Sequence, residues 1–207
     1  MARVAVVDYG LGNLRSAMNA LSCFGQELAI AETGDALADA DIIVLPGVGS
    51  FDAGMRGLRS RGHDVALTRQ VLGDGVRYVG ICLGMQFLFA GSEEGREPGL
   101  GWFGGTMRRF PSGPGAPKVP HMGWDEVEMR AGSRMFAGIE PPADFYFVHS
   151  YYAPCEGDAG RYAAATARHG FDFVAAVERD NIFAVQFHPE KSQLAGLKLL
   201  ETLLVSP

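Results

Sequence analysis

The stretch VGICLGMQFLF (79–89) sets Cys82 between two apolar runs, with Gly80 and Gly84 on either side of it. An apolar run that meets a glycine before a second apolar run predicts a strand, a sharp turn at the cysteine and a helix beginning near Met85. The pattern G-x-C-x-G is the cysteine form of a nucleophile elbow, which holds a reactive side chain clear of a parallel sheet. A buried cysteine is more often a small core residue, so other motifs must decide between the two interpretations.

The segments before the elbow alternate between short apolar runs and helical spacing, which predicts parallel βαβ units. Leu14, Met18 and Leu21 follow the 3.6-residue period of a helix, and Gly25 is placed to end it. The expected strands of this half are VAVVDYG (4–10), ELAIA (27–31), IIVLPGVG (42–49) and RYVGICLG (77–84).

From about Gly95 the chain is rich in glycine and proline, and its apolar residues then alternate instead of repeating at 3.6. Alternation predicts antiparallel strands, and a last helix is expected over Gln193 to Val205. The whole chain, 1–207, is therefore predicted to be a single α/β domain whose central sheet is extended by hairpins. The expected strands of this half are WDEVEM (124–129), FYFVHSYY (145–152), RYAAATARHG (161–170), DFVAAVERD (172–180) and IFAVQFH (182–188).

Composition excludes several classes of partner. The 207 residues carry 18 basic and 24 acidic side chains, a net charge of −6, with no basic cluster. Nucleic acid and anionic membrane surfaces are thus unexpected partners, and no apolar run approaches the ~20 residues of a membrane span. The three cysteines contain no CxxC pair, which indicates reduced thiols in a cytoplasmic protein. No metal site and no cofactor are predicted.

One early segment resembles a dinucleotide-binding fingerprint. In DYGLGNLRS (8–16), Gly10 and Gly12 follow a predicted strand, and Glu32 comes some twenty residues later. Arg15 stands where the third glycine belongs, and its side chain would obstruct close packing of the helix on the strand. A plain βα turn is the better interpretation.

A reactive thiol requires a base, and His188 is the best of the five histidines. In FAVQFHPEKS (183–192) it ends an apolar strand, and the two-residue period of a strand points Glu190 to the same face. A carboxylate beside an imidazole fixes its tautomer and stabilises the imidazolium, which favours a thiolate nearby. A histidine satisfied by the backbone remains the structural alternative. His63 and His169 are expected at the surface, whereas His121 and His149 are placed to line a pocket.

The third strand ends in PGVGSF (46–51), which is a candidate oxyanion hole. Parallel sheets bind ligands at the carboxyl ends of their strands, so this loop and the elbow should open into one crevice. The backbone N–H of Val48 or Gly49, together with that of Leu83, would then meet the developing negative charge. A glycine turn without such a task is the alternative.

At this point the sequence resembles a known family, the class I glutamine amidotransferases. GICLGMQ and QFHPE are similar to the two segments that carry the family's Cys-His-Glu triad, in the same order and about a hundred residues apart. DYGLGNLRS, LPGVGSF, PHMGW, YFVHSYY and QFHPEKS are most similar to one branch, the glutaminase subunits of imidazole glycerol phosphate synthase. One position departs from that branch: Asp125 follows PHMGW where an asparagine is expected.

The resemblance implies the class I amidotransferase (flavodoxin-like) fold and a role for each matching residue. Cys82 is expected to be the nucleophile, His188 the general base and acid, and Glu190 the group that orients the histidine. The resemblance also implies residues that hold L-glutamine: Gly47, Gln86, His149, Ser150 and Tyr151.

The resemblance further implies a partner, a TIM-barrel cyclase, with which the chain forms a heterodimer. Ammonia released from glutamine would pass to the cyclase, which makes imidazole glycerol phosphate and AICAR in histidine biosynthesis. Asn13, Trp124 and Lys191 lie in the segments that face the cyclase in this branch.

Three other functions stay open on the sequence. A glutaminase that serves another acceptor, as in pyridoxal phosphate or anthranilate synthesis, would share the triad but is disfavoured by the PHMGW and YFVHSYY segments. A γ-glutamyl peptidase of similar fold would need no partner and would cleave γ-glutamyl peptides as an isolated chain. A binding module without activity is disfavoured because Cys82, His188 and Glu190 are all present.

Overall fold

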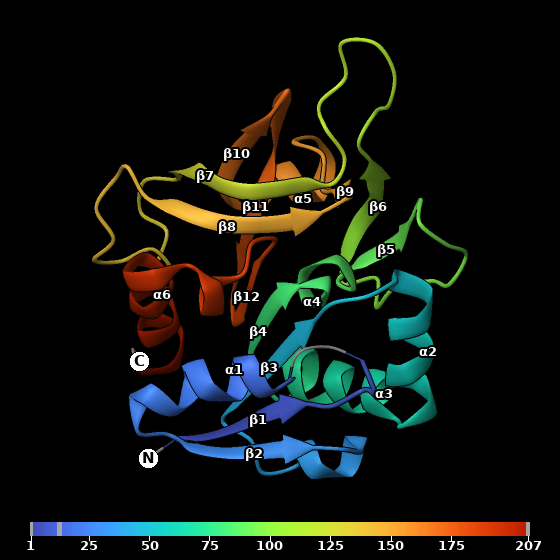
Figure 1. Cartoon of the computed structure of the whole chain (residues 1–207). Coiled ribbons are helices and arrows are strands. Elements are labelled where there is room, and N and C mark those ends of the chain that lie inside the picture. Colours follow the sequence, from blue (N-terminus) through green and yellow to red (C-terminus); the bar gives the residue numbers. More distant parts are fainter. Residues whose placement is uncertain (1, 12–13, 206–207) are drawn as a thin grey trace.

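A nine-stranded mixed sheet runs through the protein (Figure 1). The computed structural model describes residues 2–11 and 14–205. The sheet has the order β2-β1-β3-β4-β12-β11-β10-β7-β8; its first five strands are parallel to their neighbours, and the remaining pairings are antiparallel. The strands are β1 (Arg3–Val7), β2 (Glu27–Ala31), β3 (Ile42–Gly47), β4 (Arg77–Cys82), β7 (His121–Met129), β8 (Asp144–His149), β10 (Ala163–His169), β11 (Phe171–Arg179) and β12 (Ile182–Val185).

Helices cover both faces of the parallel part of this sheet, which explains why its strands are apolar on both sides. Val4 and Val44 pack with Leu21 of α1 and Leu199 of α6 on one face. Successive strand residues point the other way, against α2 and α3. Figure 1 shows α1 and α6 on the side opposite to α2 and α3. The helices are α1 (Leu14–Leu21), α2 (Phe51–Ser60), α3 (His63–Leu67), α4 (Leu83–Gln86), α5 (Gly157–Arg161) and α6 (Gln193–Val205), with shorter helical turns η1 (Ser22–Phe24), η2 (Gly34–Leu37), η3 (Thr68–Gly73) and η4 (Pro189–Lys191).

The strands predicted from the sequence are all present, and the predicted α/β class is confirmed. Gly25 adopts φ 68° after η1 and ends the first helical segment as expected. The predicted strand 145–152 is divided at Ser150 into β8 and β9 (Tyr151–Tyr152). The helix after the elbow begins at Leu83 instead of Met85 and is a single turn.

A small second sheet was not anticipated. It has the order β5-β6-β9 and is built from β5 (Phe89–Ser92) and β6 (Phe103–Arg109) with β9. The many glycines in residues 91–105 hide the alternation on which strand prediction depends. No helix among the described residues is long and apolar enough to cross a membrane.

Candidate active site

Cys82 lies at the end of β4 in a backbone conformation that few side chains adopt. Its φ is +54° and its ψ is −103°, so the predicted sharp turn between strand and helix is present. Such strain persists only where the surrounding structure enforces it, and it is often found at functional sites. The glycines on both sides are required by close packing. A Cβ at Gly84 would overlap the carbonyl oxygen of Leu45, and one at Gly80 would lie 2.8 Å from the carbonyl oxygen of Gly84.

His188 reaches the same edge of the sheet from the next strand. β12 pairs in parallel with β4, so the two chains leave the sheet at neighbouring carboxyl ends. The His188 Nδ1 lies 2.7 Å from Glu190 Oε1, and the two side chains are 2% and 7% exposed. This pairing leaves Nε2 free of hydrogen bonds to the described residues.

The charges around His188 favour its protonated form. Burial lowers the pKa of His188, but the Cys82 thiolate and the Glu190 carboxylate outweigh burial and raise the pKa to about 9. His188 is therefore protonated near neutral pH, as an imidazolium that lies beside Cys82 and is paired with Glu190. Because α4 is a single turn, its dipole is a weaker local source of positive charge beside Cys82 than the imidazolium of His188.

Backbone contacts fix the position of His188. Its N–H donates to the carbonyl oxygen of Tyr146 at 2.9 Å. Its own carbonyl oxygen accepts from Ser192 Oγ at 2.6 Å, and that hydroxyl accepts from the Tyr146 N–H at 3.0 Å. Pro189 begins the η4 turn that carries Glu190 back toward the ring. The histidine is thus held between β8 and η4 before any substrate binds.

Two glutamine side chains lie beside the thiol. Gln86 is 4% exposed, and its Nε2 donates to Gln186 Oε1 at 3.1 Å. Gln186 is fully buried, and its own Nε2 lies 3.6 Å from Cys82 Sγ as a donor. The structure therefore brings Gln86, which was predicted from the family resemblance, to the nucleophile through Gln186, which was not.

His149, at the end of β8, is a second buried histidine. His149 is 5% exposed, and its Nδ1 donates to the Tyr151 carbonyl oxygen at 2.7 Å. Burial is the main cause that lowers the pKa of His149 to about 3; the hydrogen bond to Tyr151 opposes it, and the charges of His121, His169 and His188 add to it. The ring is therefore neutral near pH 7. Ser150 and Tyr151 are half-buried beside it.

The PGVG loop lies next to the elbow, as the order of the strands requires. Gly47 is directly opposite Cys82 in the β3–β4 pairing. A Cβ at Gly47 would overlap the Tyr9 hydroxyl and lie 2.8 Å from Leu83 Cβ, so only glycine fits. Gly49 has φ 114°, which also favours glycine, while Val48 is 36% exposed. The candidate oxyanion residues thus surround the carboxyl ends of two adjacent strands.

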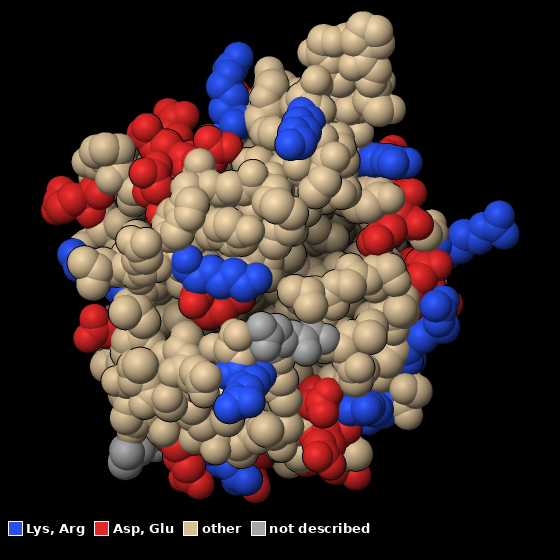
Figure 2. All heavy atoms as spheres, in the orientation of Figure 1, with Lys and Arg blue, Asp and Glu red and all other residues tan. Residues whose placement is uncertain are grey.

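Two of the residues expected to face a partner lie on β7 and on η4, the turn that also carries Glu190. Trp124 is 46% exposed and contacts Tyr146 edge-on, and the Lys191 ammonium lies 5.7 Å from the centre of the Tyr146 ring. Met122, on the same face of β7, is 61% exposed. Figure 2 shows this side of the molecule, where most charged side chains lie toward the margins. Asn13 lies outside the described residues.

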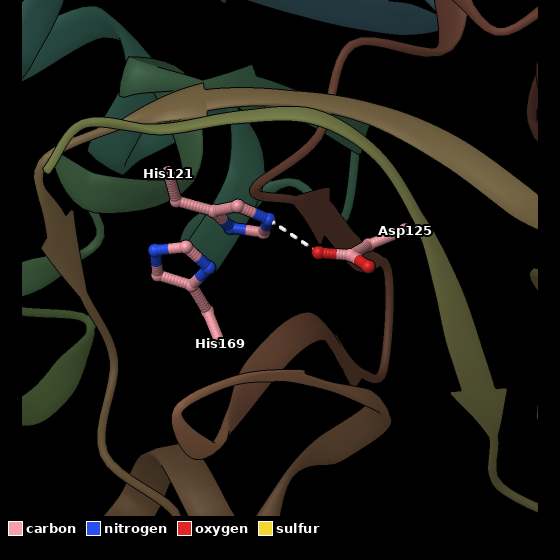
Figure 3. Close-up of side chains that lie close together, drawn as sticks. All are labelled: His121, Asp125 and His169. Atoms are coloured by element: carbon pink, nitrogen blue, oxygen red, sulfur yellow. Dashed lines mark hydrogen bonds and ion pairs between the residues drawn. The ribbon is translucent and has the colours of Figure 1, made fainter. Parts of the chain in front are cut away.

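Several polar residues lie differently from the sequence-based expectation. His63 is fully buried, and its Nε2 contacts the Asp8 carbonyl oxygen at 3.1 Å, so its predicted surface position is wrong. His169 is half-buried and stacks on His121 (Figure 3). Tyr9 is 2% exposed, and its hydroxyl has no hydrogen-bond partner among the described residues although it lies against Gly47. Gln186 had a signal that could have been used, because it is a polar residue in an apolar run, two positions before His188.

Comparison with known proteins identifies the family. Residues 5–205 match the family model described as Glutamine amidotransferase class-I. The chain belongs to the class I glutamine amidotransferases. Over 203 residues this amidotransferase is 46% identical to the imidazole glycerol phosphate synthase subunit HisH of Microcystis aeruginosa, covering 97% of the chain and 93% of that relative. It is 42% identical over 200 residues to the HisH subunit of Bdellovibrio bacteriovorus, covering 96% and 97%. The amidotransferase therefore falls within the HisH branch that its motifs resemble.

Solved structures show the same fold at lower identity. A putative GMP synthase subunit from Thermoplasma acidophilum has a TM-score of 0.72 at 20% identity, covering 98% of this chain and 92% of that one. PurLQS from Thermotoga maritima has a TM-score of 0.71 at 22% identity, with 99% and 98% covered. These likenesses support the class I amidotransferase fold of the chain.

Proposed function

We propose that this amidotransferase hydrolyses L-glutamine to L-glutamate and ammonia as the glutaminase subunit of imidazole glycerol phosphate synthase. The observation that carries this proposal is a thiol on a strained elbow beside a buried imidazole that is paired with a carboxylate. A thiolate nucleophile, a histidine that moves protons and a group that orients the histidine are the parts that acyl transfer from an amide requires.

The first half-reaction forms a thioester and releases ammonia. The Cys82 sulfur attacks the γ-carboxamide carbon, and the carbonyl electron pair moves onto oxygen. The backbone N–H groups of Val48 or Gly49 and of Leu83 stabilise this oxyanion. As the oxyanion collapses, the C–N bond breaks and His188 gives its Nε2 proton to the leaving nitrogen, which departs as NH₃.

The second half-reaction regenerates the enzyme. The neutral Nε2 of His188 takes a proton from water, and the resulting hydroxide adds to the thioester carbon. The second oxyanion collapses with cleavage of the C–S bond, which yields glutamate and restores the thiolate beside the imidazolium. Throughout, Glu190 accepts from Nδ1–H and holds Nε2 toward the sulfur. Gln86 holds Gln186 by a hydrogen bond, and Gln186 in turn donates to the Cys82 sulfur and positions it.

The ammonia is delivered to a TIM-barrel cyclase subunit in a heterodimer located in the cytoplasm, where it supports the synthesis of imidazole glycerol phosphate and AICAR. Identity of 42% to 46% with HisH subunits over nearly the full chain supports this partner. The docking surface for the cyclase contains two exposed residues near the triad, Trp124 on β7 and Lys191 in η4. Copurification of a TIM-barrel protein from the source cell is expected; isolation of the chain without one would argue for a γ-glutamyl peptidase.

The variant Cys82→Ala tests the nucleophile. It should remove glutamine-dependent ammonia production while cyclase activity with free ammonia survives, because the other two thiols of the chain are exposed at the surface. Cys23→Ala is the matched control, since Cys23 is free and exposed. Retention of more than a small fraction of glutaminase turnover by Cys82→Ala would overturn the assignment.

A further inference from the structure

A buried hydroxyl without a partner lies beside the candidate oxyanion loop. Tyr9, which follows β1, is 2% exposed, and its hydroxyl makes no hydrogen bond to the residues that the structure describes. A hydroxyl that leaves water without gaining a partner loses free energy, so such groups are rare in folded proteins. Phenylalanine would fill the same space without that loss. The hydroxyl is therefore expected to find its partner in another state of the enzyme.

The ring of Tyr9 is held in place by its neighbours. It meets Phe87 edge-on, with centroids 5.8 Å apart and planes at 84°. Gly57 is close as well, since a Cβ there would lie 3.4 Å from Tyr9 Cδ2. Burial, together with the charges of Cys82 and Asp8, raises the pKa of Tyr9 above its ordinary value of 10. The hydroxyl thus keeps its proton and stays a donor at a fixed place.

That place is the junction of the PGVG loop and the elbow. A Cβ at Gly47 would overlap the Tyr9 hydroxyl, and it would lie 2.8 Å from Leu83 Cβ and 3.5 Å from the Gly84 nitrogen. The carbonyl of Gly47 belongs to the same peptide as the N–H of Val48, which is a candidate oxyanion donor. The Tyr9 hydroxyl therefore lies against the backbone whose orientation decides whether that N–H faces the substrate.

The thiol and the Tyr9 hydroxyl belong to opposite faces of the sheet. Cys82 packs in the apolar cluster that includes α6, whereas Tyr9 packs in the cluster that includes α2. A trans peptide directs its C=O and its N–H to opposite sides. When the Val48 N–H turns toward the thiol, the Gly47 carbonyl oxygen therefore turns toward the face of Tyr9. In the orientation that the structure shows, this carbonyl does not accept from the hydroxyl.

We propose, on the basis of the glutaminase function given above, that Tyr9 is a positioning residue of the oxyanion hole. Its hydroxyl donates to the Gly47 carbonyl oxygen when the Val48 N–H faces the thiol. Because this hydrogen bond forms in that orientation alone, it favours the catalytic loop over the resting one, in which the hydroxyl is unpaired. The sequence indicated the loop but not Tyr9, because β1 and β3 become neighbours only in the folded sheet.

The variant Tyr9→Phe removes the hydroxyl and keeps the ring. In the isolated chain, its kcat for glutamine hydrolysis should fall about fivefold to tenfold, which corresponds to one neutral hydrogen bond, while KM stays the same. The loss should be smaller in the complex with the cyclase and its nucleotide substrate, because the partner then favours the same orientation. The variant should be no less stable to urea than the parent, so general damage to the fold cannot explain a lower kcat. Tyr162→Phe, whose ring contacts Phe103 and Arg179, is the matched control and should keep the parent's kcat and KM.

NMR relaxation dispersion of the Val48 amide adds a measurement that does not depend on turnover. The parent should show a minor Val48 conformation whose population falls about fivefold to tenfold in Tyr9→Phe. A parent that hydrolyses no glutamine, alone or with the cyclase, would refute the glutaminase function, and the Val48 populations would still decide the role of Tyr9. Equal kcat in an active parent and Tyr9→Phe would overturn the proposal. So would equal Val48 populations, a single Val48 conformation in the parent, or a Tyr9→Phe variant that is less stable than the parent.

Discussion

The His188 imidazole lies between the Cys82 thiolate and the Glu190 carboxylate, and these neighbours can be removed separately. His188→Ala removes both proton transfers and should approach the Cys82→Ala rate. Glu190→Gln leaves an imidazole that can still transfer protons, although in a poorer tautomer and position. Its glutaminase rate should therefore fall clearly less than that of His188→Ala. Steady-state glutaminase rates of the two variants decide this, and equal rates would count against the assigned roles.

The same pair makes stability depend on pH. The pKa of His188 is about 9 in the folded protein, above its ordinary value of 6.5, so folding favours the bound proton. This stabilisation is complete below pH 6.5 and is lost as pH rises through 9. Urea denaturation should show a fall in unfolding free energy over this window that is smaller in Cys82→Ala. A flat profile in both proteins would contradict the raised pKa.

Removal of the Tyr9 hydroxyl should make the protein more stable. Its hydroxyl is buried without a partner among the described residues. Tyr9→Phe removes the desolvated group and keeps the ring contact with Phe87, so the free energy of unfolding should rise by about 1 kcal/mol. Tyr146→Phe, at a half-exposed tyrosine, is the control for which little change is expected. A less stable Tyr9→Phe would mean that the hydroxyl has a partner in solution.

At the scale of single residues, short motifs predicted the catalytic residues, but the sequence did not predict which polar side chains are buried. Cys82 could be selected because turn glycines act locally. The strand period led to Glu190 for the wrong reason, because β12 ends at Val185 and it is the η4 turn that brings Glu190 to His188. His63 is polar and sits among arginines in the sequence, yet it is fully buried under the Asp8 carbonyl. Its place depends on a contact 55 residues away, which no local pattern records.

Among the elements, the elbow depends on glycines that are packed against other strands. A Cβ at Gly84 would overlap the Leu45 carbonyl oxygen, and backbone cannot rotate away as a side chain can. Gly84→Ala should therefore destabilise the protein by roughly 1 to 3 kcal/mol and impair the glutaminase. Gly91→Ala, where a Cβ meets nothing within 4 Å, should do neither. Thermal unfolding and ammonia release measure both, and similar behaviour of the two variants would refute the packing argument.

The parallel strands were predictable because burial on both faces demands continuous apolar runs, as in β3 and β4. The final helix was predicted with the bounds it has, Gln193–Val205, because the η4 turn and its own leucines delimit it. β5 and β6 were not predicted. Their glycines remove side-chain alternation, and β6 pairs with β9, which comes more than forty residues later in the chain.

For the whole molecule, the PGVG loop, exposed at Val48 and Gly49, suggests that the isolated chain is a poor glutaminase. Val48 lies between two glycines, so a peptide flip that turns an oxyanion N–H away costs little. Loss of one such donor costs roughly 2.7 to 4 kcal/mol of barrier, on the order of a hundred- to a thousandfold in rate. Docking of the cyclase with its substrate should favour the active orientation.

Glutamine hydrolysis should be measured for the chain alone, with the cyclase, and with the cyclase plus its nucleotide substrate. A rise of about two orders of magnitude in the third condition is expected. Identical turnover in all three would rule out a partner-controlled loop.

The single-domain organisation of residues 1–207 stays a prediction, for which limited proteolysis without a stable fragment is the expected result.

The position of β12 has a consequence for synthesis on the ribosome. This strand comes from residues 182–185 but lies between β4 and β11, in the middle of the sheet. Until it emerges, the nascent chain has two unpaired strand edges, which are sites for aggregation or chaperone binding. His188 and Glu190 follow the same strand, so an unfinished chain has a thiol but no base. The amidotransferase consequently cannot consume glutamine before β12 and the residues that follow it have been made.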